Sequence, residues 1–264
     1  MPYTIVLFHA HPDDEAIATG GTMARAKSEG HRVVLVSATR GELGEHAPDS
    51  LAPGEELVDR RVAELNAAAE ILGADRVAFL DYLDSGMAGE PTNNAPGSFA
   101  SADIDEAATR LAKILDEEHA DVLTIYDENG NYGHPDHIQV HRVGHRAAEL
   151  AGTPVVYEAT MNRDAVQRLV EMAAELAPEL DIDPPEMPED MEFGMPEAAL
   201  TTAVDVSGFI TQKRESITMH ASQVTDSSFF LRMPIEVFAR AFSTEWFIRK
   251  GAPPGIHEDK LAGL

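Results

Sequence analysis

Two short segments of the chain concentrate residue types that bind metal ions and move protons. The first reads Ala-His-Pro-Asp-Asp-Glu over residues 10–15, and the second reads Asn-Tyr-Gly-His-Pro-Asp-His over residues 131–137. In the first segment, His11 and Asp14 are three residues apart on a turn that Pro12 stiffens, so both can face one ion. Asp13 lies between them, points elsewhere, and can reach a water molecule on that ion.

The second segment can complete such a site. His137 can supply a third ligand and leave one position open, and three protein ligands with an open position are typical of catalytic rather than structural zinc. His134 and Tyr132 can face the open position as hydrogen-bond donors. Asp136 can orient one of the imidazoles.

Both segments also have structural interpretations. Acidic residues at 13–15 can cap a following helix and offset the positive end of its dipole. Asp136 can likewise be an N-cap, with the nearby histidines on a polar surface loop. Capping leaves the His-Pro pairs unexplained, so we favour the metal site, provided that the fold brings the two segments together.

The elements that must position these segments alternate between strand and helix. Strands are expected at 4–9, 32–38, 76–80, 121–126 and 154–158, and helices at 16–29, 55–72, 104–118 and 137–150. This alternation predicts an α/β fold with a mostly parallel sheet and helices on both faces. Ligands bind outside the carboxyl ends of such strands, so both segments are expected at one edge of the sheet. The first strand is not followed by a Gly-x-Gly-x-x-Gly turn, which disfavours a dinucleotide cofactor.

Beyond residue 160 the pattern is less regular. A helix over 163–176, an acidic, proline-rich loop over 184–190, a strand over 200–206, helices over 209–220 and 228–242, and an extended segment over 244–249 are expected. We predict a single domain over residues 1–264, with a core over 1–160 and a C-terminal α+β elaboration over 161–264. His220 and Gln223 are spaced for one helix face, although a lone helical histidine is more often a satisfied core or surface residue. Several large apolar residues are assigned to the core or to an interface between copies of the chain, which leaves a homo-oligomer open: Met219, Phe229, Phe230 and Met233.

Composition narrows the classes of partner and of site. Among 264 residues, 20 Lys and Arg oppose 46 Asp and Glu, giving a net charge of −26. Such a surface repels phosphate backbones and anionic lipid, so neither nucleic acid nor a membrane is an expected partner. Cysteine is absent, so a transition-metal site must be built from histidine and carboxylate. No apolar stretch approaches the roughly 18–20 residues of a membrane span and no leader is evident, so we expect a soluble, cytoplasmic protein.

The two segments resemble the motifs of the PIG-L/LmbE-like deacetylases, zinc-dependent hydrolases of N-acetylglucosaminyl compounds on a Rossmann-like fold. The resemblance extends over roughly residues 3–160. It implies that His11, Asp14 and His137 bind zinc. Weaker matches lie at Arg61-Val-Ala-Glu64, Asp84-Ser-Gly-Met87 and His220-Ala-Ser-Gln223.

The same resemblance implies roles for the remaining residues. Asp13 would be the general base, and His134 the electrophilic partner of the reaction intermediate. Tyr132 would assist, and Asp136 would orient His134. The sugar or inositol part of the substrate would be held by two residues outside the main motifs, Arg61 and Asp84.

Within this family the chain most resembles the mycothiol-pathway enzymes. The amidases that cleave mycothiol S-conjugates carry a lysine shortly after the first motif, whereas this chain has Ala-Ile-Ala-Thr over residues 16–19. We therefore predict a zinc-dependent hydrolase that removes the acetyl group from a small N-acetylglucosaminyl-type conjugate. One alternative is an amidase acting on a larger N-acyl conjugate, and another is a metal-containing binding protein without turnover. The same ligands also suit Fe²⁺, Mn²⁺ or Co²⁺.

Overall fold

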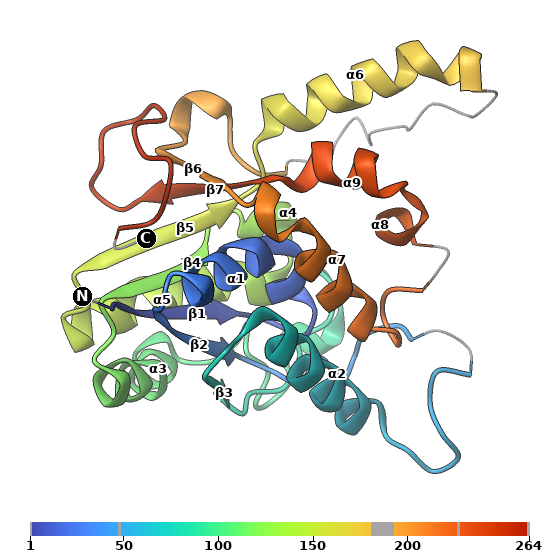
Figure 1. The fold of residues 1–264 in the computed structure, drawn as a ribbon. Helices are drawn as coiled ribbons and strands as arrows, with labels where there is room; N and C mark the ends of the chain where they lie inside the picture. Colours follow the sequence, from blue (N-terminus) through green and yellow to red (C-terminus); the bar gives the residue numbers. More distant parts are fainter. Residues whose placement is uncertain (1, 47–48, 181–192, 226–227, 263–264) are drawn as a thin grey trace.

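Strands and helices alternate along the chain in the computed structural model, which describes residues 2–46, 49–180, 193–225 and 228–262 (Figure 1). The strands are β1 (Thr4–His9), β2 (Arg32–Ser37), β3 (Arg76–Phe79), β4 (Val122–Tyr126), β5 (Val155–Thr160), β6 (Thr202–Asp205) and β7 (Thr244–Arg249). The longer helices are α1 (Gly20–Ser28), α2 (Leu57–Leu72), α3 (Ile104–Glu118), α5 (Pro135–Ala151), α6 (Arg163–Leu180) and α7 (Ile210–Met219). Shorter helices are α4 (Gly130–Gly133), α8 (Phe229–Arg232) and α9 (Ile235–Phe242). The acidic loop expected at 184–190 lies outside the described residues.

Within the described residues, seven strands form one sheet in the order β3-β2-β1-β4-β5-β7-β6. The pairings among β1 to β5 are all parallel, whereas β7 runs antiparallel to both of its neighbours. The predicted mixed α/β class with a mostly parallel sheet is therefore confirmed. Because β1 pairs directly with β4, the loops that leave their carboxyl ends are neighbours at one edge.

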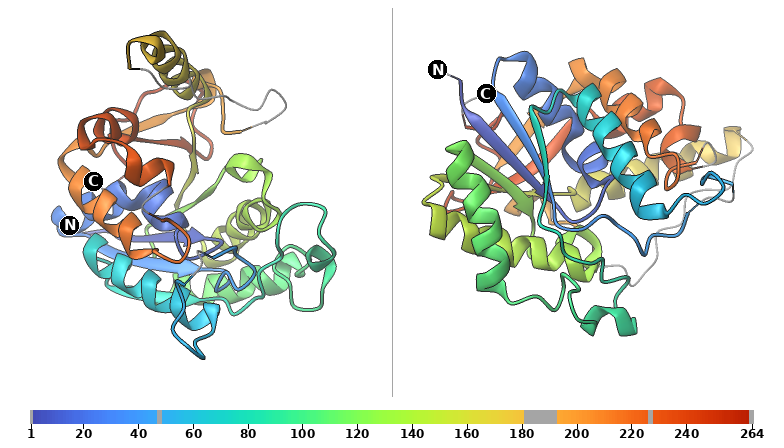
Figure 2. Two further views of the ribbon diagram at one scale, coloured as in Figure 1. Left: turned by 90° about the vertical axis from the view of Figure 1, so that its right-hand side faces the viewer. Right: turned by 90° about the horizontal axis from the view of Figure 1, so that it is seen from below.

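Helices cover both faces of the sheet. Figure 2 shows α1, α2 and α7 on one face and α3 and α5 on the other. The apolar face of α2 packs inward, with Leu65, Ala68 and Leu72 buried. This helix ends at Gly73, whose left-handed backbone (φ 79°) lets its N–H bond the carbonyl of Glu70.

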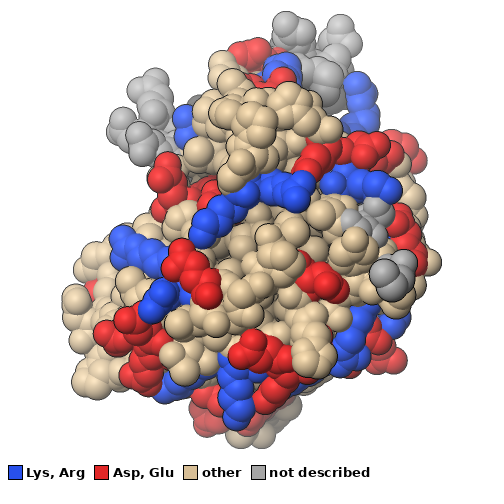
Figure 3. Space-filling model, turned by 90° about the vertical axis from the view of Figure 1, so that its left-hand side faces the viewer, with Lys and Arg blue, Asp and Glu red and all other residues tan. Residues whose placement is uncertain are grey.

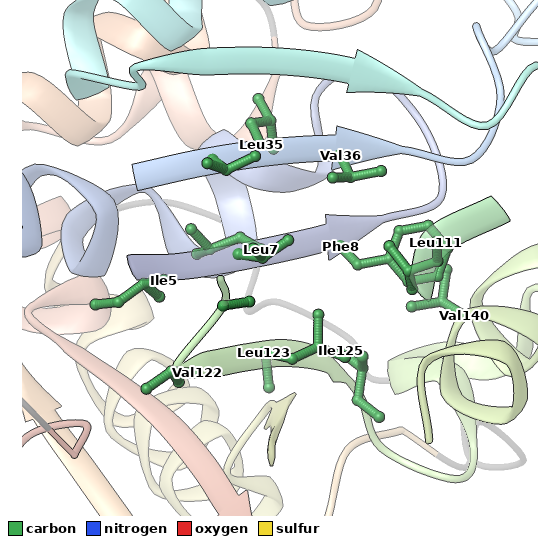
Figure 4. Close-up of a cluster of buried hydrophobic side chains, with 14 of the residues drawn as sticks. Ile5, Leu7, Phe8, Leu35, Val36, Leu111, Val122, Leu123, Ile125 and Val140 are labelled. Carbon is green, nitrogen blue, oxygen red and sulfur yellow. The ribbon is translucent and has the colours of Figure 1, made fainter. Parts of the chain in front are cut away.

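The main core lies between the sheet and these two helix layers, as Figure 4 shows around Ile5, Leu7 and Phe8. All three side chains on β1 are fully buried, although successive residues of a strand point to opposite faces. A parallel sheet covered on both sides requires this continuous apolar run. Each buried Leu or Phe side chain contributes about 1.5–3 kcal/mol, so β1 is firmly fixed below the loop that follows it.

The C-terminal part extends the sheet and joins it to α1. On β7, Glu245 accepts hydrogen bonds from the N–H groups of Gly21 and Thr22 and forms a 2.5 Å ion pair with Lys213 of α7. The single helix expected over 228–242 is wrong. Pro234 separates α8 from α9, because its ring cannot continue a helix from the preceding turn.

The face at the amino ends of the strands carries both signs of charge in alternation, despite the strongly acidic composition (Figure 3). Ion pairs link Arg32 to Glu118, Arg76 to the same glutamate, and Lys27 to Asp75. These contacts neutralise part of the acidic charge on this side of the sheet. Among the described residues, no helix is both long and apolar enough to cross a bilayer.

Candidate active site

The first segment forms a tight, strained turn directly after β1. Asp13 has a positive φ of 113°, and a π-helical turn over Glu15–Thr19 replaces the regular helix start expected at residue 16. A non-glycine residue in such a conformation costs about 1–3 kcal/mol and is concentrated at functional sites, as are π-turns. The turn is held by two carboxylates: Glu15 accepts the N–H of Asp13 at 3.0 Å, and Asp14 accepts that of His11 at 2.8 Å.

His11 lies between two carboxylates, one on each side of its ring. Its Nε2 is 3.0 Å from Asp136 and its Nδ1 is 3.5 Å from Asp14. Burial by itself would lower the pKa of His11, but the hydrogen bonds to Asp136 and Asp14 outweigh burial and raise the pKa well above its usual range. The carboxylate of Asp136 can only accept, so Nε2 carries a proton. Nδ1, which faces Asp14, becomes available to a metal ion when the ring gives up its other proton.

Asp14 joins His11 to His137. Its two oxygens lie 3.5 Å from His11 Nδ1 and 3.4 Å from His137 Nε2. Burial opposes ionisation of Asp14, but the nearby His137 and the hydrogen bond with His11 hold its pKa well below the usual range. Both separations exceed a good N–H···O hydrogen bond and are close to the roughly 3.3 Å between ligands of a tetrahedral zinc ion. Asp14 is therefore spaced from each of the two histidines as two ligands of one zinc ion would be.

His134 offers an alternative third imidazole, since nitrogens of His11, His134 and His137 lie within 4.8 Å of one another. The Nδ1 of His134, however, accepts the backbone N–H of Asp136 at 3.1 Å as the N-cap of α5. That bond fixes the tautomer with the proton on Nε2. Burial, reinforced by the two neighbouring histidines, lowers the pKa of His134 to about 4, so the ring is a neutral hydrogen-bond donor. Asp14, rather than His134, therefore stays the predicted ligand.

The loop after β4 brings His137 to the metal position. Asp127 accepts the N–H groups of Asn129 and Asn131 and so folds the loop back on itself. Gly130 (φ 62°) lies so close to His137 that an added Cβ would be 2.7 Å from the Cβ of that histidine. The ring of His137 stacks on Tyr126, with centroids 4.6 Å apart. Glycine at position 130 is thus required by the close approach of the loop to α5.

Tyr132 lies at the open side of the cluster, with 40% of its surface exposed. Its hydroxyl is 3.5 Å from His137 Nε2, and its ring meets that of His137 edge-on. Burial of the hydroxyl end raises the pKa of Tyr132, so the phenol keeps its proton. A protonated phenol at this position can donate a hydrogen bond to a bound molecule.

Asp136 does not orient His134 through its carboxylate, and this expectation needs correction. The carboxylate, fully buried, accepts from His11 Nε2 and from both the N–H and the hydroxyl of Ser85. Only the backbone N–H of Asp136 reaches His134. The carboxylate therefore orients the ligand His11, because the first turn of α5 directs the side chain towards β1.

Arg61, which was expected to bind the sugar, is buried and bonded to other parts of the protein. It is 3% exposed, and its guanidinium donates to the carbonyl of Gly41 at 2.7 Å and to that of Pro12 at 2.5 Å. It also lies 3.3 Å from the carboxylate of Asp13. Burial raises the pKa of Asp13 to about 6, although the charge of Arg61 opposes the rise. Arg61 thus holds the strained turn and its carboxylate in place.

Asp84 is 6% exposed and is engaged by the protein as well. It accepts the N–H groups of Gly86 and Leu43, and it lies 3.5 Å from His11 Nε2. Burial would raise the pKa of Asp84, but the contact with His11 and the two N–H groups lower it. The expected role of Arg61 and Asp84 in binding substrate stays a prediction.

Two further residues support the site from outside the main motifs. His220, fully buried just after α7, binds Glu15 at 2.7 Å, and Glu15 in turn holds the N–H of Asp13. Ser85 supports Asp136, as described above. Ser85 and His220 lie within the weaker family matches at residues 84–87 and 220–223, so the sequence indicated that these segments matter. Neither match indicated which residue of the candidate site it would contact.

Comparison with known proteins identifies the family to which the chain is similar. The family model described as PIG-L, GlcNAc-PI de-N-acetylase, matches residues 6–148. A relative from Thermobifida fusca, named 1D-myo-inositol 2-acetamido-2-deoxy-alpha-D-glucopyranoside deacetylase, is 42% identical over 285 aligned positions, gaps included, and the alignment covers 98% of each chain. A relative from Catenulispora acidiphila, which has the same name followed by the number 1, is 36% identical, covering 98% of this chain and 89% of that protein.

A solved structure extends the comparison to the fold. N,N'-diacetylchitobiose deacetylase from Pyrococcus horikoshii matches with a TM-score of 0.59 at 22% identity, covering 93% of this chain and 83% of that one. This likeness concerns the architecture, because the sequences have diverged far. The family match and the two relatives of nearly equal length are the stronger finding. This chain belongs to the PIG-L family, the GlcNAc-PI de-N-acetylases.

Proposed function

We propose that this chain is a metal-dependent hydrolase that removes the acetyl group from a small N-acetylglucosaminyl conjugate. One observation carries the proposal: the predicted ligands His11, Asp14 and His137 lie at one edge of the sheet together with the carboxylate of Asp13 and the neutral imidazole of His134. Metal binding alone requires neither group. The names of the relatives point to a glucosaminyl-inositol as the first substrate to test.

His11, Asp14 and His137 would hold the metal ion, and zinc is the identity that we propose. Two imidazole nitrogens and one carboxylate oxygen form a ligand set common to catalytic zinc. When bound, such an ion polarises a carbonyl group and lowers the pKa of water at the open position towards about 7. Asp136 fixes the ring of His11 from behind, which supports the ligand geometry.

Asp13 is the group that we assign to proton transfer. Its carboxylate, 21% exposed, lies between the predicted ligands His11 and Asp14 in the chain, and a pKa near 6 suits a base that must give its proton back. Asp13 accepts a proton from the attacking water and then delivers it to the departing amine, so acetate and a free amine are formed. Such general acid–base catalysis contributes typically about 10²–10⁴-fold.

His134 and Tyr132 are the groups that we assign to the oxyanion formed on the acetyl carbon. The Nε2–H of His134 and the hydroxyl of Tyr132 are both donors, and both flank His137. Preorganised donors of this kind are each worth about 10²–10³-fold in kcat. A neutral imidazole can stabilise the oxyanion without giving up its own proton.

The finer fold assignment belongs to the same proposal. The parallel order β3-β2-β1-β4-β5 supports a Rossmann-like core, with the site at the crevice beyond the carboxyl ends of β1 and β4. β6 and β7 complete the same sheet, which supports one domain with a C-terminal elaboration.

A second candidate function is cleavage of a larger N-acyl conjugate by the same groups. It is favoured by apolar side chains that remain exposed in the loops after β2 and β3: Leu43 at 45%, Leu83 at 51% and Met87 at 52%. These loops leave the same edge of the sheet as the catalytic groups, so they can contact an apolar part of a substrate.

The test is release of free amine by the zinc-loaded chain. N-acetylglucosaminyl-inositol, free N-acetylglucosamine and a mycothiol S-conjugate are incubated with equal amounts of enzyme, and amine is quantified with a fluorogenic reagent. We expect the inositol conjugate to react fastest, and the Asp13→Asn variant to serve as the matched inactive control. Faster cleavage of the S-conjugate would favour the second function, and no amine from any substrate would contradict both.

A further inference from the structure

A second group of metal-binding side chains lies on the same helix as the candidate catalytic site. His141 and His145 follow His137 at successive four-residue intervals on α5, so they lie on nearly the same face of the helix. Their rings meet edge-on with centroids 4.5 Å apart. Glu158 on β5 completes the group, since α5 packs against β4 and β5. None of the three contributes to the proposed hydrolysis.

The carboxylate of Glu158 faces both imidazoles through one oxygen. Its Oε1 lies 2.7 Å from His145 Nε2 and 3.8 Å from His141 Nδ1. One ligand atom from each of the three residues lies within 4.8 Å of the other two. Ligands of a tetrahedral ion are separated by roughly 3.3 Å, so the three side chains lie close enough to surround one after local rearrangement.

The surroundings of the group favour a cation. Within the described part of the chain, Glu158 forms ion pairs only with these two histidines, so no lysine or arginine competes for its charge. The side chains of all three residues are 16–21% exposed, which gives an ion a route in and leaves room for water to complete its coordination. The Nδ1 of His141 is also 3.0 Å from the carbonyl oxygen of Tyr126. Because a carbonyl oxygen can only accept, that nitrogen carries the proton, and Nε2 is the nitrogen left to bind an ion. Anchoring of a ligand histidine by a backbone carbonyl is common at metal sites.

We propose that His141, His145 and Glu158 form an accessory site for a divalent transition-metal ion such as Zn²⁺, Ni²⁺ or Co²⁺. Two imidazoles and one carboxylate suit these ions better than Mg²⁺ or Ca²⁺, which prefer oxygen ligands alone. A bound ion would link α5 to β5. Because α5 begins with the residues that bind and orient the catalytic ligands, the link would stabilise the helix that carries the active site.

The test counts metal ions in the full chain. The protein is stripped with a chelator, dialysed against a small excess of Zn²⁺, and its metal content is measured by mass spectrometry. We expect about two ions per chain for the wild type and about one for His145→Ala and for Glu158→Gln. His257→Ala, which removes a histidine outside both clusters, is the matched control and should retain two.

A second measurement isolates the accessory site. In His137→Ala the catalytic position is disabled, so Zn²⁺ at a hundredfold excess over its Kd should still raise Tm by roughly 5 °C or more. The double variant His137→Ala with His145→Ala should show no such rise. Two ions retained by His145→Ala, or a wild type that binds no more zinc than His145→Ala, would overturn the accessory site. A wild type that binds one ion, lost only in His145→Ala, would support the accessory site and contradict the catalytic one.

Discussion

Two clusters of charged side chains in this protein differ in how closely their carboxylates are hydrogen-bonded. Glu245 and Lys213 are each 2% exposed, and Glu245 has both oxygens occupied by fixed donors: the backbone of Gly21 and Thr22 and the ammonium of Lys213. At the catalytic cluster, Asp14 faces two imidazoles at 3.4 and 3.5 Å. These separations are too long for strong hydrogen bonds.

The difference separates a structural cluster from a reactive one. A buried carboxylate whose oxygens are all satisfied at short distance is locked, and nothing is left for a ligand to contact. The carboxylate of Asp14, 14% exposed, accepts the backbone N–H of His11 but still faces two imidazoles at ligand spacing, and a cation can take the position between them. Substitutions in the first cluster should therefore affect stability, and substitutions in the second should affect metal binding and turnover.

The largest expected effect on activity follows removal of a ligand. His137→Ala should lose its catalytic metal ion and reduce kcat/KM on the order of 10⁴-fold or more, because several kcal/mol of charge stabilisation disappear. Metal content and amine release measured on the same sample check this prediction. Full activity in a variant that has lost one ion would show that the ion at His137 is not catalytic.

Asp13→Asn should retain the metal and lose turnover. The amide preserves the shape of the strained turn but cannot accept a proton, so kcat should fall about 10²–10⁴-fold with little change in KM. Steady-state kinetics with metal analysis separate this result from a loss of metal. An Asp13→Asn variant with nearly wild-type kcat would transfer the role of base to another carboxylate, Glu15 first.

The opposite behaviour is expected at the structural cluster. Lys213→Met leaves the carboxylate of Glu245 buried without its cation, and breaking such a pair costs about 3–5 kcal/mol. Tm should fall by roughly 10 °C, while kcat/KM at 25 °C stays within twofold of wild type. Thermal melts report the first quantity, and Lys113→Met, at a side chain that is 78% exposed, is the matched control. A stable but inactive Lys213→Met would remove the distinction between the two clusters.

A smaller effect is expected from the carboxylate that orients His11. Asp136→Asn should weaken metal affinity or activity about 10–100-fold, as is usual when the partner of a ligand histidine is altered. Competition with a chromogenic zinc chelator measures the affinity directly. If Asp136 acted on His134 instead, as the resemblance implied, kcat would fall while zinc affinity stayed unchanged.

The sequence predicted the framework better than the contacts within the site. The strand–helix alternation and the position of residues 10–15 and 131–137 at one edge followed from periodicity and from the topology of parallel sheets. The hydrogen-bond partner of the Asp136 carboxylate could not be predicted in this way, because the direction of a side chain in the first helical turn depends on how α5 crosses β1 and β4. For the same reason His220, more than 200 residues from Glu15, could not be placed against it from spacing alone.

The contacts of Arg61 could not be predicted from the sequence either, and its substitution is expected to have the smallest effect on activity. The resemblance suggested that it binds the sugar, whereas its guanidinium is buried against Pro12, Gly41 and Asp13. Arg61→Lys keeps the charge but cannot reproduce the planar fork that bridges these groups. We therefore expect kcat to fall about tenfold through misplacement of Asp13, with KM for the sugar conjugate within about twofold of wild type. Lys250→Met, at a half-exposed lysine on the far side of β5, controls for loss of positive charge. An Arg61→Lys variant with raised KM and unchanged kcat would restore the sugar-binding role and show that the guanidinium leaves Asp13 when substrate binds.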